Sequence, residues 1–318
     1  LVDSINILVI QAFYALAAGG TIVCSQYIGQ KDKKNAEESA RQLSFVVACI
    51  SSAVMAVCLL TRGPLLRLIF GSVEAAVMEA AQIYFFYTAL SFPFIALYDA
   101  GSSIYRAQGN TRLPMTIAVV SNGLNIAGNA VLIWGFHLGV AGAAIATVFA
   151  QAVSVLFAVV ILLKKELPFS VAREDVRINP QYGKFLGIGL PLALQGFLTQ
   201  LSFLALCAFV NRLGLEASSG YGVACKIVNF AMLIPSALMQ SMASFISQNI
   251  GAGKHQRARQ TLRTGIGIGL FFGLFVFALV LCKGDLLCSF FTTDAPVIAN
   301  GYAYLKGFAL ETILTAIL

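Results

Sequence analysis

Charged residues are scarce in this sequence, and the short motifs of nucleotide-driven or metal-dependent enzymes are missing. Only 11% of the 318 residues are charged, compared with about 25% in soluble domains. The Walker A pattern G-x-x-x-x-G-K-[ST] does not occur, so ATP is not the expected energy source. The paired DDxxD motifs that an intramembrane prenyltransferase needs are also missing. We therefore do not expect an enzyme.

The seven cysteines show no metal-binding or redox spacing. They include no C-x-x-C pair and lie in or beside apolar segments, away from any histidine cluster. We interpret them as small buried residues, and we expect no metal cluster and no organic cofactor.

In place of charge, the chain has long apolar runs. Hydrophobic residues make up 58% of it, and the mean hydropathy is +0.84. A membrane-spanning helix needs about 20 apolar residues. Uncharged runs of 18 to 49 residues cover 43–60, 185–211, 227–253 and 115–163, and the last must hold two spans broken at "GFHLG". Because the period-2 alternation of a β-barrel is absent, we predict an all-α polytopic membrane protein.

Nine candidate spans follow when the whole chain is read in this way. They lie near residues 1–29, 43–61, 77–105, 113–134, 140–163, 185–210, 218–250, 264–282 and 297–318. Leu1 opens inside an apolar segment without a basic n-region, and Leu318 stops inside another. We therefore expect a fragment of a longer protein.

Basic residues concentrate in loops of one parity. Together, loops 30–42, 106–112, 164–184 and 251–263 hold 15 Lys and Arg residues, whereas the alternate loops hold 4. By the positive-inside rule the first set is cytoplasmic. The net charge of +7 therefore reflects membrane orientation and does not indicate nucleic-acid binding.

A seventeen-residue motif occurs twice in the chain. "SQYIGQKDKKNAEESAR" at 25–41 returns 222 residues later as "SQNIGAGKHQRARQTLR" at 247–263, with six identities. Six spans lie between the copies, so both copies face the cytoplasm and the halves are parallel repeats. We expect Gly29 and Gly251 to end their helices.

The hydrophilic segment 165–184 separates the two halves. We expect an N-terminal lobe at 1–164, a cytoplasmic linker at 165–184 and a C-terminal lobe at 185–318. Two parallel repeats suggest a secondary transporter that handles its substrate near the membrane midplane. Its energy should then come from an ion gradient.

An ordered set of motifs resembles a known family. "SQYIGQKD", "SQNIGAGK", "SIYRAQGNTRLPM", "NGLNIAGNAVLIWGFHLGVAGAAIATVFAQ" and "YGVACKIVNF" together look like a bacterial MATE (multidrug and toxic compound extrusion) transporter. The resemblance implies a V-shaped, two-lobed protein of two six-helix repeats, in which the nine spans are helices 2 to 10. It also implies a monomeric antiporter of the cytoplasmic membrane that exports small organic cations in exchange for protons or sodium by alternating access.

The resemblance assigns a cation site in the N-terminal lobe to Asn125, Asn129 and Thr147. Their amide and hydroxyl oxygens suit sodium or a protonated carboxyl group. Relatives carry Asp or Asn where this chain has Asn129, so this half lacks a visible carboxylate on helix 5. Simple helix packing through amide hydrogen bonds is the alternative interpretation.

Glu311 is the carboxylate expected to exchange a proton or sodium for cargo, because a charge inside the membrane needs a cavity or a partner. A structural ion pair with Lys226 or Lys306 is the alternative. Lys226 is expected in the central cavity as a charge partner, or else extended to the outer interface. Asp99 and Asp3 are the other acids within spans. Asp99 stands where relatives usually carry Asn, and it is expected to pair with Arg106 or to line the cavity.

One other function on the same fold remains open from the sequence. A flippase for lipid-linked glycans shares this fold, although the motif set favours drug export. A receptor or scaffold would not need an internal parallel repeat. The leading prediction is an ion-coupled exporter of organic cations that functions in the lipid bilayer.

Overall fold

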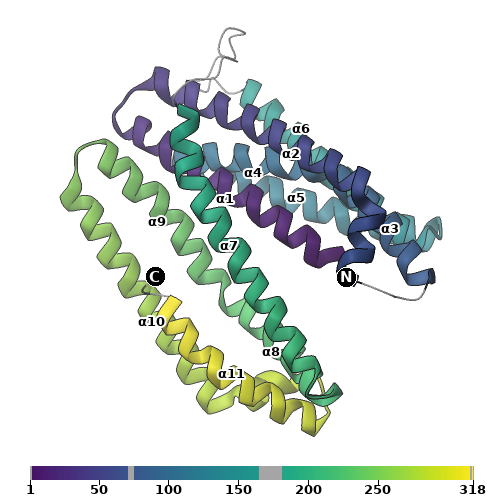
Figure 1. Ribbon diagram of the computed structural model, residues 1–318. Helices are drawn as coiled ribbons and strands as arrows, with labels where there is room; N and C mark the ends of the chain where they lie inside the picture. Colours follow the sequence, from purple (N-terminus) through teal and green to yellow (C-terminus); the bar gives the residue numbers. More distant parts are fainter. Residues whose placement is uncertain (1, 71–74, 165–180, 316, 318) are drawn as a thin grey trace. The chain divides into compact units, whose positions relative to one another are not determined.

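A computed structural model describes residues 2–70, 75–164, 181–315 and 317. All the regular structure in these ranges is helical, as a chain in hydrocarbon requires when it must satisfy its own backbone. The helices are α1 (Val2–Gly29), α2 (Lys33–Phe70), α3 (Ala75–Leu90), α4 (Phe92–Ala107), α5 (Arg112–Asn129), the π-helix η1 (Ala130–Gly135), α6 (Gly139–Lys164), α7 (Gln181–Asn211), α8 (Leu215–Ala231), α9 (Leu233–Gly251), α10 (His255–Ser289) and α11 (Ala295–Thr315) (Figure 1). Most of the expected linker, 165–180, lies outside the described residues.

Eight segments of the described chain can cross a membrane. Seven are long and apolar enough alone, and α3 with α4 forms an eighth that is bent by 40°. The ninth expected span corresponds to α11. The all-α polytopic prediction is therefore confirmed.

The chain divides into two compact units, Leu1–Phe197 and Leu198–Leu318. In the first unit, α4 packs against α1, α2 and α6, and Figure 1 shows α1, α2 and α4 side by side. Small residues on α4 permit this close approach, since Ala96 and Ala100 are fully buried. Phe13 of α1 meets Phe92 of α4 edge to face, with ring centroids 6.1 Å apart.

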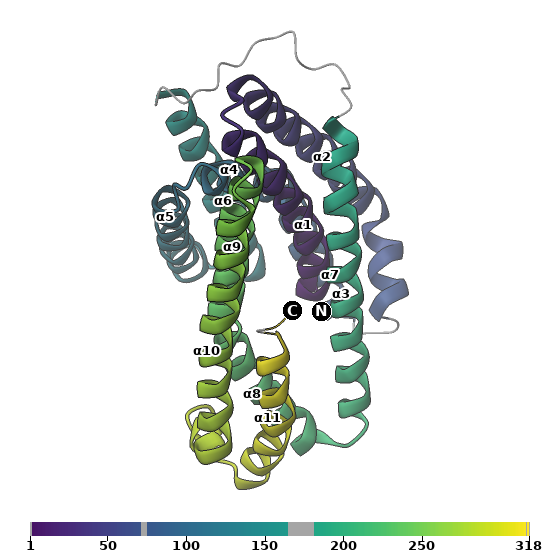
Figure 2. The same ribbon diagram turned by 90° about the vertical axis from the view of Figure 1, so that its left-hand side faces the viewer.

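In the second unit, α11 packs against both α8 and α10, and Figure 2 shows α10 and α11 side by side. Aromatic contacts join α11 to α8, because Tyr221 and Tyr304 lie 4.8 Å apart between ring centroids. A Cβ on Gly220 would lie 2.7 Å from the backbone nitrogen of Gly301. Glycine is therefore required there for the two helices to approach so closely.

The two copies of the repeated motif form the same turn. In the first, the Asp32 amide donates to the Tyr27 carbonyl (3.0 Å), and in the second the Lys254 amide donates to the Asn249 carbonyl (2.8 Å). These bonds have the 6→1 spacing of the Schellman motif, which satisfies carbonyls at a helix end. The helices end at Gly29 and Gly251 as predicted.

The left-handed residue of each turn comes two positions after that glycine. It is Lys31 (φ 60°) in the first copy and Gly253 (φ 70°) in the second, again 222 residues apart. The first turn has an additional cap, because the Asn35 amide donates to Asp32 Oδ1 at 3.1 Å. Hydrogen bonds from the Asn35 side chain and amide lower the pKa of Asp32.

Two prolines of the apolar segments lie close to helix breaks. Pro93 follows the break at Ser91 between α3 and α4, and Pro235 follows the break at Met232 between α8 and α9. Pro191 lies inside the continuous helix α7. A proline inside an apolar segment is therefore not sufficient to break its helix.

We predict that Gly253→Ala lowers the free energy of unfolding by about 1 kcal/mol, because an L side chain is strained at positive φ. Gly267→Ala is the matched control. It places a methyl group in open space in an ordinary helical position, so its stability should stay equal or rise. Thermal unfolding in detergent measures both variants. Equal stability of the two variants would contradict the assigned turn.

Candidate functional site

Three polar side chains form a hydrogen-bonded chain between α5 and α6. The Asn129 amide nitrogen donates to Asn125 Oδ1 at 3.1 Å, and the Asn125 amide nitrogen donates to Thr147 Oγ1 at 3.1 Å. The Thr147 hydroxyl in turn donates to the Ala143 carbonyl at 2.9 Å. The structure therefore brings together the three residues that the sequence analysis assigned to one site.

All three hydrogen bonds run in the same direction, each donor lying on the Asn129 side and each acceptor on the Ala143 side. The Asn129 end of this hydrogen-bonded series therefore presents an acceptor, Oδ1. Asn129 Oδ1 is buried, and no donor among the described residues reaches it. A buried carbonyl oxygen without a partner costs about 1–3 kcal/mol, so this end of the chain favours a cation or a proton donor.

The backbone changes from α-helix to π-helix directly after Asn129. Asn129 is the last residue of α5, and the π-helix η1 starts at Ala130. Its wide turn is visible in the hydrogen bond from the Phe136 amide to the Val131 carbonyl (3.1 Å). Short π-helical segments occur frequently at functional sites. Nothing in the sequence pattern distinguishes six π-helical residues from α-helical ones.

The approach of α5 to α6 depends on a small residue beside the site. A Cβ on Gly128 would lie 3.1 Å from the Cβ of Ala146. The absence of a side chain at Gly128 therefore permits the close approach of the two helices that carry Asn125 and Thr147. Amide and hydroxyl oxygens are hard neutral ligands of the kind that a sodium ion accepts.

In the second unit, the expected ion pairs of Glu311 with Lys226 or Lys306 do not form among the described residues. Among the described residues, no ion pair connects Glu311 with Lys226 or Lys306. Lys226 Nζ lies over the Phe291 ring, 5.9 Å from its centroid, and Lys306 Nζ lies 4.2 Å from the Tyr302 centroid. Both lysines are therefore placed against aromatic faces, which attract cations. Glu311 is exposed on α11.

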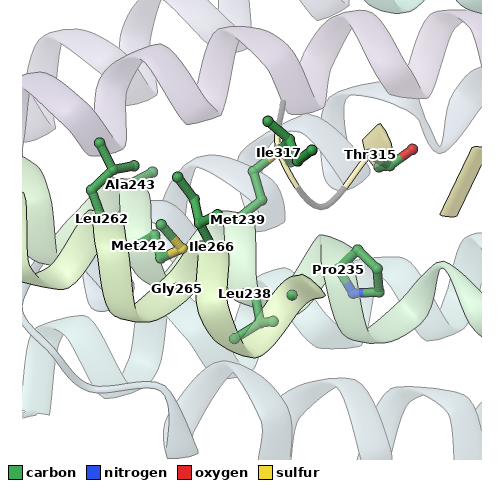
Figure 3. Close-up of a pocket in the computed structure, with 11 residues that line it drawn as sticks. Pro235, Leu238, Met239, Met242, Ala243, Leu262, Gly265, Ile266, Thr315 and Ile317 are labelled. Carbon is green, nitrogen blue, oxygen red and sulfur yellow. The ribbon is translucent and has the colours of Figure 1, made fainter. Parts of the chain in front are cut away.

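A cavity of about 200 Å³ lies near Glu311 in the second unit but is apolar. Figure 3 shows Met239 and Met242 of α9 facing Leu262 and Ile266 of α10. Its one hydroxyl-bearing residue is Thr315, whose Oγ1 donates to the Glu311 carbonyl (2.9 Å). None of the described lining residues is charged, so this cavity by itself selects no charge.

Of the two remaining acids within spans, the structure describes the side chain of Asp99 but not that of Asp3. Asp99 is half-buried on α4 and lies within electrostatic range of Arg106. Asp3 belongs to α1, but its side chain lies outside the described residues.

The chain matches one protein family over most of its length. Residues 1–131 and 191–318 match the model of the family described as MatE. The chain is 26% identical over 301 residues to the probable multidrug resistance protein YoeA of Bacillus subtilis, covering 90% of this chain and 63% of that protein. It is 28% identical over 220 residues to the FAD transporter of Shewanella oneidensis, covering 68% of this chain and 49% of that protein.

A solved structure shows a similar fold. The MATE transporter VcmN of Vibrio cholerae in its bent form superposes with a TM-score of 0.84 at 22% identity, covering 98% of this chain and 73% of that one. The likeness supports the fold assignment. The chain spans about half to two thirds of the length of the two curated relatives above.

We expect sodium chloride to raise the melting temperature of the protein above its value in potassium chloride of equal ionic strength. A ligand that binds only the folded state stabilises it by about 2.7 kcal/mol at 100 times its Kd. Asn129→Leu should abolish the difference. Ser121→Ala removes a separate α5–α6 hydrogen bond, from Ser121 Oγ to the Ala150 carbonyl (3.0 Å), and should preserve it. Equal melting temperatures for the wild type in both salts would contradict sodium binding at this site.

Proposed function

Because the chain belongs to the MatE family, we propose that the protein exports small organic cations across the cytoplasmic membrane in exchange for sodium ions or protons. The eight membrane-crossing segments agree with a multi-pass transporter. The name of the Bacillus subtilis relative supports drug-like cargo. The proposal of cation antiport in particular is argued from the polar residues of this chain, as follows.

The observation that carries the proposal is the buried Asn129 Oδ1, which has no donor among the described residues. An oxygen in this state is stabilised by whatever brings positive charge or a proton to it. Asn125 Oδ1 and Thr147 Oγ1 belong to the same hydrogen-bonded chain. We propose that these three residues hold the coupling ion, with sodium favoured because all their ligand atoms are neutral.

Glu311 is the proposed second exchange point. An ionised carboxylate in the membrane interior costs about 2.5–3.5 kcal/mol on insertion scales, and no described cation is paired with it. A proton, a sodium ion or a cationic cargo molecule would each remove that cost. Competition among them for one carboxylate would couple export to the ion gradient.

The two lobes are proposed to extend over 1–164 and 185–318, and the export cycle is proposed to work by alternating access. Lys226, Asp99 and Asp3 are proposed to contact the cargo. Lys226 lies over the Phe291 ring in this structure, and it is proposed to repel cationic cargo when Glu311 is neutral.

We predict that proteoliposomes containing the full-length protein accumulate ethidium when a sodium or pH gradient is applied. Glu311→Gln should reduce uptake to the level of protein-free liposomes, because the exchangeable charge is lost. Glu216→Gln is the matched control, since Glu216 lies in the first turn of α8, and it should transport normally.

The same assay separates the other candidate functions. Uptake retained in Glu311→Gln but lost in Asn129→Leu would place coupling in the first unit alone. FAD, the cargo named for the Shewanella relative, is tested as a competitor. No uptake of ethidium by folded protein under either gradient would contradict cation antiport and favour a lipid-linked glycan flippase.

A further inference from the structure

One row of exposed residues runs along α10 in the second unit. Its members are four positions apart, so they follow one another along the same side of the helix. They are Arg259, Arg263, Gly267, Phe271 and Phe275, and all five are exposed. The Phe271 side chain is 77% exposed, and a Cβ on Gly267 would meet no atom within 4 Å. The row therefore faces away from the described remainder of the second unit.

The two arginines of this row lie at the level of the lipid headgroups. Residues 264–282 of α10, between Arg263 and Lys283, carry no charge. These residues extend for about 28 Å along the helix, which matches a hydrocarbon core of about 30 Å. Arg263 is therefore at one boundary of the core, and Arg259 lies one turn, about 6 Å, beyond it. By the same measure Phe271 and Phe275 lie inside the core.

No nearby acid in the sequence balances these arginines. There is neither Asp nor Glu from Ala217 to Gly284, and among the described residues neither Arg259 nor Arg263 forms an ion pair. Lys254 and Arg257 add two further exposed charges to the same segment. Its positive potential is therefore left for an anion from outside, and loop 251–263 is one that the positive-inside rule assigns to the cytoplasm.

The first copy of the repeated motif has a different charge at the same positions. At the offset of 222 residues, Asp32 stands in place of Lys254 and Glu37 in place of Arg259. Segment 25–41 holds four basic and three acidic residues, a net charge of +1, whereas segment 247–263 holds four basic and no acidic residues, a net charge of +4. The turn is therefore repeated in both units, but its excess of positive charge is not.

The apolar part of the row, in contrast, is exposed in both units. The residues of α2 that correspond to Gly267, Phe271 and Phe275 are also exposed, and they are Phe45, Cys49 and Ala53. The first unit includes two further helices, α5 and α6, yet α2 packs chiefly against α1, α3 and α4. Both rows thus face the lipid, and only the row of α10 ends in two arginines.

We propose that this row of α10 binds an anionic phospholipid of the cytoplasmic leaflet. The lipid phosphate contacts Arg259 and Arg263, whose guanidinium groups donate paired hydrogen bonds to phosphate oxygens. One acyl chain lies along Gly267, Phe271 and Phe275. Arg263 and Phe275 are separated by about 18 Å of helix, close to the half-thickness of the hydrocarbon core, about 15 Å. This inference does not depend on the proposed export function.

The test is a lipid titration of the purified full-length protein in a neutral detergent. Thermal unfolding gives the concentration of dioleoyl phosphatidylglycerol at which stabilisation is half complete. For the wild type this concentration should be at least tenfold lower than that of dioleoyl phosphatidylcholine, which has no net charge. The variant R259Q/R263Q should raise it roughly 25-fold, because each cation near an anionic surface contributes about fivefold.

Two control variants separate a site from a general effect of charge. K33Q/K34Q removes two exposed lysines from the first copy of the motif and should match the wild type. R259K/R263K keeps both charges of the row and should stay within about threefold of the wild type. Arg259→Gln alone, with an expected weakening of about fivefold, decides the question if R259Q/R263Q does not fold.

Glycerol 1-phosphate distinguishes a lipid from a soluble phosphate compound. It carries the phosphate group without acyl chains, so it should not stabilise the wild type at the concentration where phosphatidylglycerol is half effective. Equal potency of the two would contradict a lipid site. The proposal would also be wrong if the wild type responded equally to both lipids, if R259Q/R263Q bound phosphatidylglycerol like the wild type, or if K33Q/K34Q lost as much affinity as R259Q/R263Q.

Discussion

The structure depends on one constraint, which is that a chain in hydrocarbon must satisfy its own backbone hydrogen bonds. Continuous helices meet this requirement, and each departure from one needs another partner. At the non-helical residue Lys283 in α10, the Tyr302 hydroxyl donates to the nearby Leu281 carbonyl at 2.9 Å. At the break after α3, the Ser91 hydroxyl donates to the Thr88 carbonyl at 2.6 Å. Breaks occur where side chains can compensate for them.

The same constraint gives the first unit two polar sites of different character. The chain ending at Asn129 contains only neutral groups and leaves an acceptor open at the start of a π-helix. Asp99 on α4 is instead a half-buried acid within electrostatic range of Arg106. A cluster of neutral oxygens suits a small bare ion.

The second unit handles its charges differently. Lys226 and Lys306 lie over aromatic rings, so their charges are stabilised without an ion pair to a carboxylate. Glu311 is thereby left without an ion-pair partner among the described residues. An acid in this position is available to an incoming cation, which is why the proposed exchange in this unit centres on it.

The sequence alone determined the helical membrane fold, the order of the helices, and the turns at Gly29 and Gly251. These features follow from apolar run length, loop charge and a repeat at a constant offset, all of which can be read along the chain without knowing its contacts. It also identified Asn125, Asn129 and Thr147, but only through family resemblance. The direction of their hydrogen bonds and the open oxygen of Asn129 were decided by the tertiary structure. Each depends on which helix faces which, and burial without a partner is a property of surrounding atoms that no local pattern records.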